Sequence, residues 1–258
     1  MEIVVLGTAH GRPIFGRLHT SIALRTGEDL YLLDCGEPCA AGLHREALDP
    51  HRVRAAFVSH MHPDHSCGLF MLLKEMHLGR RETPFTLCLP EEAIEPLRQF
   101  LPHVYCAPEL LNFPLTLSPI RPEASVWADG NLSLKAHRNS HLWFGPSGAR
   151  DDGAHSFSFV AHVEGKRIVW TGDVPRTFDE LGPLLQKPTD LLLSELTHMD
   201  PAPYFEFLGQ FDVGTVLFHH VYEKHFEDFI DWGAMLTRAK ARLNGQVHIA
   251  HDGYRMVL

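Results

Sequence analysis

The segment Ser59-His60-Met61-His62-Pro63-Asp64-His65 places three imidazoles and one carboxylate within six consecutive positions. The apolar residues 53–58 before it are typical of a buried strand, and the apolar spacing of residues 67–78 after it predicts a helix. Because Pro63 disfavours helix before Asp64, we predict a loop, with His65 at the mouth of the helix. In an extended stretch His60 and His62 project to the same side, whereas Asp64 and His65 come from the turn.

This segment has the ligand types of a metal centre. Imidazole and carboxylate groups suit zinc, manganese and iron. Two neighbouring metal ions can be served in this way, one by His60 and His62 and the other by Asp64 and His65. The alternative is a polar surface loop that carries its histidines by chance, and it does not account for their spacing. The segment therefore predicts a two-metal centre whose remaining ligands lie elsewhere in the chain.

The composition is ordinary for a soluble globular protein, since 45% of the 258 residues are apolar and 21% are charged. We predict one domain that spans residues 1–258. No stretch reaches the roughly 18 uninterrupted apolar residues of a membrane helix, and residues 1–6 lack the features of a signal peptide, so we expect a cytoplasmic protein. The five cysteines are scattered along the chain, which argues against a disulfide framework.

The net charge narrows the range of substrates. With histidine neutral the formal charge is −9, which argues against a broad surface for long nucleic acid, because such binding depends on clustered Lys and Arg. A small anionic substrate is compatible with this charge, since metal ions supply positive charge locally. The charge therefore favours a small molecule over a long nucleic acid.

Other candidate ligands follow segments that are predicted to be strands. Asp34 ends the second arm of a predicted hairpin, where it could orient a ligand histidine or form part of a turn or helix cap. Residues that follow several strands can meet at one rim of stacked sheets. The candidates with this placement are His60 to His65, His141, Asp173, His198 and His219.

The order of these features resembles the metallo-β-lactamase superfamily over nearly the whole chain. The matching features are Gly7-Thr8, Asp34-Cys35-Gly36, His60-x-His62-x-Asp64-His65, His141, Gly172-Asp173 and His219. The resemblance implies an α/β fold, the metallo-β-lactamase αββα four-layer sandwich, in which helices flank two mixed β-sheets. It also implies a dinuclear metal site at one edge of the sheets.

The resemblance further implies a ligand set. It assigns His60, His62 and His141 to the first metal ion, Asp64, His65 and His219 to the second, and Asp173 to a bridge between them. His137 competes with His141, and His220 competes with His219. We prefer His141 because it lies at the end of a predicted strand, and His219 because it directly follows an apolar run.

Two further stretches resemble the phosphodiesterase branch of the superfamily, which includes tRNase Z and the PhnP-like cyclic phosphodiesterases. They are Ser194-Glu195-Leu196-Thr197-His198 and the closing residues 248–254. The resemblance implies that His198 is a proton donor or an oxyanion contact. The long arm of tRNase Z has no counterpart in the short glycine-rich segment 142–155, and only Cys35 and Cys39 could serve the extra zinc site of the PhnP-like enzymes.

We therefore expect a hydrolase that uses water activated by two divalent metal ions, zinc or manganese, with iron as an alternative. The expected substrate is a small or cyclic phosphodiester, with Asp64 or Asp173 as proton acceptor and His198 as proton donor. The alternatives are a lactone or thioester hydrolase of the same fold, an iron-binding oxidoreductase, and an accessory protein of a biosynthetic pathway. The sequence leaves the oligomeric state open, a homodimer included.

Overall fold

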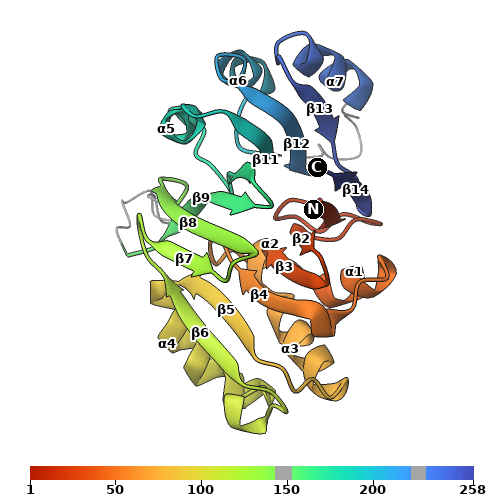
Figure 1. Ribbon diagram of the computed structural model, residues 1–258, viewed down its shortest axis with the longest axis vertical. Coiled ribbons are helices and arrows are strands. Elements are labelled where there is room, and N and C mark those ends of the chain that lie inside the picture. Colours follow the sequence, from red (N-terminus) through yellow and green to blue (C-terminus); the bar gives the residue numbers. More distant parts are fainter. Residues whose placement is uncertain (143–152, 222–230) are drawn as a thin grey trace.

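The computed structural model describes residues 1–142, 153–221 and 231–258, which form two seven-stranded sheets with helices beside each of them (Figure 1). The first sheet has the strand order β14-β1-β2-β3-β4-β5-β6, and the second has the order β13-β12-β11-β10-β9-β8-β7. Each sheet combines parallel and antiparallel pairs. Both sheets are therefore mixed, as the sequence predicts.

The first half of the chain supplies most of the first sheet, and the last strand completes it. Its strands are β1 (Glu2–Gly7), β2 (Ser21–Thr26), β3 (Asp29–Leu33), β4 (Val53–Phe57), β5 (Phe85–Pro90), β6 (Leu115–Ile120) and β14 (Tyr254–Val257). The helices that accompany it are α1 (Cys39–Arg45), α2 (Pro63–Ser66), α3 (Leu69–Leu78) and α4 (Glu91–Phe100), with short 3-10 turns at η1 (Pro50–Arg52), η2 (Leu101–Val104) and η3 (Pro108–Leu110).

The second half of the chain forms the second sheet. Its strands are β7 (Ser125–Ala128), β8 (Leu132–Asn139), β9 (Ser156–Val163), β10 (Lys166–Trp170), β11 (Thr189–Leu196), β12 (Val213–Val221) and β13 (Gln246–Ile249). Its helices are α5 (Gly182–Leu185), α6 (Pro201–Leu208) and α7 (Trp232–Lys240), with a 3-10 turn at η4 (Phe178–Leu181). No helix of the described residues is long and apolar enough to cross a membrane.

Three apolar layers hold these elements together. The middle layer lies between the sheets and contains Phe57 from β4 and Phe159 from β9, both fully buried. Strand β3 shows how one segment serves two layers, because Tyr31 faces the middle layer while its neighbour Leu32 packs toward the helices of the first sheet. A third layer joins the second sheet to α5, α6 and α7. The predicted αββα sandwich is confirmed.

The strand directions bring the candidate site residues to one edge. In the second sheet β8, β10, β11 and β12 all run in the same direction, so their carboxyl ends share an edge. The first sheet meets them there, since the Phe157 backbone N–H donates to the Ser59 carbonyl over 3.1 Å. The segment after β4 therefore faces the residues that follow β8, β10 and β11 and the histidines near the end of β12, His219 and His220.

The structure refines the prediction for the residues around Pro63. Pro63 begins the short helix α2, where its fixed φ and missing N–H are tolerated at the first position. Asp64 and His65 thus lie in the first turn of a short helix where the sequence predicts a loop, and the predicted helix 67–78 corresponds to α3, which begins at Leu69. The loop spans only residues 58–62, so its histidines lie close to the end of β4.

Candidate metal centre

The histidines of the loop after β4 converge on one point. The His60 Nε2 and His62 Nδ1 atoms are 2.9 Å apart, and the two rings meet edge to face. His60 is fully buried, and its Nδ1 lies 3.0 Å from the Ser59 hydroxyl, which fixes the nitrogen that faces His62. The Ser66 hydroxyl donates to the His62 carbonyl over 2.9 Å and holds the loop against α2.

The second sheet adds two side chains to this pair. His141 follows β8, and its Nε2 lies 3.5 Å from His62 Nδ1. Asp173 follows β10, and its Oδ2 lies 3.7 Å from His141 Nε2 and 3.8 Å from His60 Nε2. These four side chains offer ligand atoms that all lie within 4.8 Å of one another. The structure thus brings together the three histidines predicted for the first metal ion and the predicted bridge.

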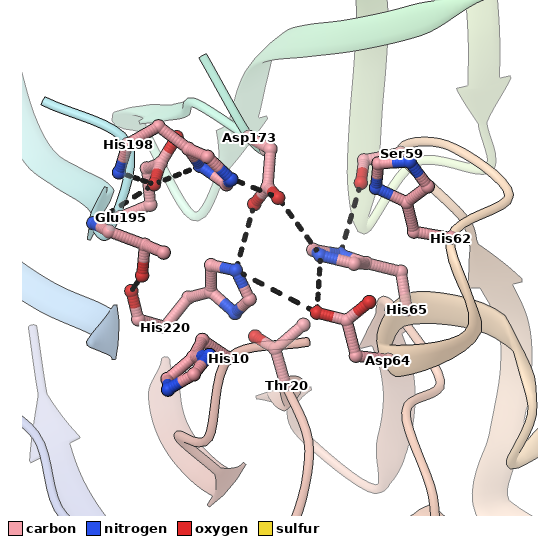
Figure 2. Close-up of polar contacts among 12 residues, drawn as sticks. His10, Thr20, Ser59, His62, Asp64, His65, Asp173, Glu195, His198 and His220 are labelled. Atoms are coloured by element: carbon pink, nitrogen blue, oxygen red, sulfur yellow. Dashed lines mark hydrogen bonds and ion pairs between the residues drawn. The ribbon is translucent and has the colours of Figure 1, made fainter. Parts of the chain in front are cut away.

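A second group adjoins the first through Asp173 (Figure 2). His65 Nε2 lies 3.3 Å from Asp173 Oδ2 and 3.5 Å from Asp64 Oδ2. His220 Nε2 lies 3.4 Å from Asp173 Oδ1 and 3.8 Å from Asp64 Oδ2. Asp173 Oδ2 faces histidines of both groups, and Oδ1 faces His220 of the second group. This carboxylate therefore has the placement that a bridging ligand requires.

The geometry differs from the sequence-based preference for His219. His219 Nδ1 faces the Thr20 hydroxyl at 3.4 Å, and His220 takes the position beside Asp64 and Asp173. The cause is a bulge in β12, where the register with β11 shifts across His219 and His220, and His220 has a φ of 49°. The extra residue reverses which histidine faces the site, and position after an apolar run carries no signal of such a bulge.

His137, the competitor of His141, lies outside the cluster. It is part of β8, and its Nδ1 is 2.8 Å from the carboxylate of Glu123. The preference for His141 over His137 therefore agrees with the geometry, because only His141 lies beyond the end of the strand and against His62.

Asp34 supports the site through hydrogen bonds from Ser59 and His65. It follows β3 with a φ of 60°, and its carboxylate accepts from the Ser59 backbone N–H at 2.7 Å and from the Ser59 hydroxyl at 3.1 Å. It also accepts from His65 Nδ1 at 2.7 Å, which leaves Nε2 of that ring for Asp64 and Asp173. Of the roles that the sequence leaves open for Asp34, the structure has the contact with a candidate ligand histidine, His65.

The electrostatics separate the histidines into two kinds. Burial lowers the pKa of His60 well below its ordinary value, with the charge of His65 adding to the effect, and burial lowers the pKa of His141 to about 4. Burial also acts to lower the pKa of His65, but the carboxylates of Asp173 and Asp34 outweigh it and hold that pKa well above the usual range. His60 and His141 are therefore neutral at physiological pH, as imidazole ligands must be.

The donor set fits divalent metal ions. The carboxyl group of Asp173 is ionised, because His220 and His65 outweigh the effect of burial and keep its pKa well below the ordinary value. Within the described part of the chain, the buried atoms His65 Nε2 and Asp173 Oδ1 form no hydrogen bond. Buried polar atoms seldom lack a partner, and here they lie among imidazole and carboxylate groups, which are the ligand types that zinc, manganese and iron accept.

His198 lies at the border of the two groups and is held by Glu195. The fully buried Glu195 accepts from His198 Nδ1 at 2.8 Å and from the backbone N–H groups of Val174, Thr197 and His198. His198 Nδ1 is 3.8 Å from Asp173 Oδ2. Burial acts to lower the pKa of His198, but its hydrogen bond to Glu195 and the charges of Glu195 and Asp173 raise it to about 9.

Sequence reasoning missed the supporting role of Glu195. The only signal was its spacing of three residues from His198 at the end of a strand. It also missed His10, which lies beside His220 after β1 (Figure 2), where burial and the charge of His220 lower its pKa. Most of the glycine-rich segment 142–155, residues 143–152, lies outside the described part of the chain.

The two-sheet sandwich and the cluster of histidines and aspartates at its edge agree with the predicted resemblance to the metallo-β-lactamase superfamily, whose fold the similar solved structures share. A family model described as Anti-Pycsar protein Apyc1 matches residues 1–203. The chain therefore belongs to this family.

Individual proteins are also similar to this chain in sequence or in fold. The curated protein Ribonuclease Z of Pyrococcus abyssi is 32% identical over 135 residues, which are 50% of this chain and 43% of that protein, so the match spans less than half of the relative. The structure of YhfI from Bacillus subtilis has a TM-score of 0.77 at 19% identity and covers 99% of this chain and 98% of its own. Zinc-bound PqqB from Methylobacterium extorquens has a TM-score of 0.75 at 18% identity, with both chains fully covered.

The neighbouring pair His219 and His220 gives a matched test of the second ligand group. We expect His220→Ala to lose about one of two bound metal equivalents, because its imidazole faces Asp64 and Asp173. His219→Ala should keep both, although it removes an equally buried ring. Metal analysis of both purified variants after zinc loading measures this difference. The opposite pattern would assign the ligand to His219.

The contact between Asp34 and His65 gives a second test. We expect Asp34→Ala to weaken metal binding by about 10–100-fold, because His65 would lose the acceptor that fixes its ring. Ser21→Ala is the control, since it removes the hydroxyl that donates to the Asp34 backbone carbonyl at 3.0 Å and leaves the bond between the Asp34 carboxylate and His65 intact. Competition with a chromophoric chelator measures the affinities, and equal affinities in the two variants would contradict the role of Asp34.

Proposed function

We propose that the chain is a dinuclear phosphodiesterase that hydrolyses small or cyclic phosphodiesters. The observation that carries this proposal is the position of the Asp173 carboxylate between the two ligand groups. Its Oδ2 lies 3.7 Å from His141 Nε2 of the first group and 3.3 Å from His65 Nε2 of the second, and its Oδ1 lies 3.4 Å from His220 Nε2. A shared carboxylate between two groups of ligands is the arrangement that holds two metal ions close together. Two ions held in this way would stabilise both the attacking and the leaving oxygen of a phosphodiester.

The proposed ligands follow the geometry. His60, His62 and His141 would hold one ion, Asp64, His65 and His220 the other, and Asp173 would bridge them. When bound, the two ions would make water a nucleophile at neutral pH and neutralise charge on the phosphodiester. Zinc or manganese is the proposed metal, and the zinc in the structurally similar PqqB supports zinc.

The protein's own groups move the protons. Asp64 and Asp173 are buried acceptors at the meeting point of the ligand groups, so either could take the proton of the attacking water. His198 would donate a proton to the leaving alkoxide. Its Nδ1 is engaged by Glu195, which leaves Nε2 for the substrate, and the Glu195 carboxylate stabilises the charged form of the ring.

Glu195 and His198 could also be counted among metal ligands, because they offer atoms near Asp173 and His220. The hydrogen bonds of Glu195 argue against this role. Its two oxygens already accept from three backbone N–H groups and from His198 Nδ1. A carboxylate that is committed in this way is better suited to orient His198 than to bind an ion.

The phosphodiester is favoured over a lactone or a thioester by the matched relative, whose name, Ribonuclease Z, denotes an enzyme that acts on RNA. Because the match covers 43% of that relative, its substrate does not transfer as a whole. The charge of −9 supports a small or cyclic phosphodiester rather than a long nucleic acid, which requires clustered cations.

The substrate class can be tested with a panel of compounds. We expect metal-loaded protein to hydrolyse cyclic and short linear phosphodiesters, and to leave lactones and glutathione thioesters unchanged. Liquid chromatography of the products after loading with zinc or manganese measures this. Failure to turn over any phosphodiester with both metal sites filled would sink the proposal, and turnover of a lactone alone would move the activity to carbonyl chemistry.

The pair of Glu195 and His198 gives a mechanistic test. We expect His198→Ala to lower kcat by about 10²–10⁴-fold with its metal content retained, because a proton donor is lost but no ligand. Glu195→Gln should cause a smaller loss, since it removes the charge that supports the protonated ring. His137→Ala is the matched control, because His137 also pairs with a glutamate but lies outside the site. Loss of metal from His198→Ala would instead make His198 a ligand.

A further inference from the structure

Asn139 is the last residue of β8, and its buried amide joins two of the proposed ligands. Its Nδ2 donates to the carbonyl of Asp173 at 2.9 Å and to the Ser158 hydroxyl at 3.2 Å. Its Oδ1 accepts from the backbone N–H of His141 at 3.2 Å. The Asn139 side chain, only 3% exposed, therefore contacts both His141, beyond the end of β8, and Asp173, beyond the end of β10.

The chemistry of the amide explains why asparagine suits this place. The position requires one acceptor, for a backbone N–H, and two donors, for a carbonyl and a hydroxyl, and the primary amide offers this set. The reversed amide would set donor against donor at His141 and acceptor against acceptor at Asp173, so the orientation is decided by the network. The Ser158 hydroxyl completes it by donating to the carbonyl of Thr171 at 2.6 Å.

The ligands on the two sides are not anchored equally. The residues of the first sheet, His60 to His65, come from one short continuous segment that is pinned by Ser59, Ser66 and Asp34. His141 and Asp173 come from different strands, and Asn139 and Asp173 are 34 residues apart in sequence. A direct bridge through Asn139 sets the distance between these two ligands, whose side chains approach to 3.7 Å.

A neighbouring contact holds the same turn from outside. Ser140 donates through its backbone N–H at 3.0 Å and its hydroxyl at 2.9 Å to one oxygen of Glu180, in η4. This bond fixes Ser140 but reaches neither His141 nor Asp173 directly. The turn Asn139-Ser140-His141 therefore has an outer tie to Glu180 and an inner tie to Asp173, and only the inner one connects two ligands.

We propose that Asn139 is a positioning residue that couples His141 to Asp173 and thereby sets the affinity for the metal ion held by His60, His62 and His141. This inference rests on the proposed dinuclear centre but not on the identity of its substrate. Removal of the amide would leave the His141 N–H and the Asp173 carbonyl unpaired in a buried place, and both ligands would shift to find other partners. The ion on the side of Asp64, His65 and His220 should be affected much less.

The test uses Asn139→Leu, which keeps the volume of the side chain and adds no charge, with Asn139→Ala as a second variant. Ser158→Ala is the matched control, because it removes one partner of the amide and leaves both bonds to the ligands. Each metal-free protein is titrated with Zn²⁺ by calorimetry and with Co²⁺ by visible absorption. Thermal unfolding of the metal-free proteins checks that each variant is folded.

We expect both Asn139 variants to bind one of two equivalents about 10–100-fold more weakly, with an altered Co²⁺ spectrum, while Ser158→Ala behaves like the wild type. Wild-type affinity for both equivalents in folded Asn139→Leu and Asn139→Ala would overturn the inference and leave the dinuclear centre standing. An equal loss in Ser158→Ala would also overturn it, because the effect would then be structural. Failure of the wild type to take up metal would overturn the centre itself.

Discussion

The buried carboxylate of Asp173 is the interaction on which the site depends. A buried charge is costly unless it is paired, and Asp173 is paired with imidazoles from both sheets, His65 from the first and His220 from the second. Among protein groups alone, protonated His65 balances this charge, since Asp173 and Asp34 raise the pKa of the ring. Metal ligation requires a neutral imidazole, so an ion bound there would take over the charge that the proton on His65 supplies.

The first-sheet half of the site could be predicted because its information is local. His60, His62, Asp64 and His65 lie in one segment, and a strand before it and a helix after it are readable from apolar spacing. The helix boundary was less predictable, because Pro63 can precede a helix or begin one, and here it begins α2. The αββα fold was implied by the resemblance of the ordered motifs to the metallo-β-lactamase superfamily, and the two mixed sheets agree with it.

The second-sheet half was predictable in position but not in detail. His141 and Asp173 follow strands, as the sequence indicated, but the choice between His219 and His220 depends on a bulge in β12. A bulge adds one residue to a strand, so the side chains that follow it point to the opposite face of the sheet. The apolar run in the sequence gives no indication of the bulge. Supporting contacts were equally hidden, because Asn139 acts through a buried hydrogen bond to Asp173, 34 residues away, and the spacing of three between Glu195 and His198 does not reveal their buried hydrogen bond.

The division of the ligands between the sheets links the site to the stability of the fold. An ion that bound His60, His141 and Asp173 would join the two sheets across the edge where they otherwise meet through Phe157 and Ser59. Binding that occurs only in the folded state stabilises it by about 2.7 kcal/mol at a free metal concentration of 100 times Kd. The supporting hydrogen bonds would set Kd, because they fix how well the two halves match before metal arrives. Asp34 on the first sheet and Asn139 on the second would thus both set the Kd for the metal ion, each by fixing the ligands on its own side of the site. The side whose ligands are held less well would limit the affinity.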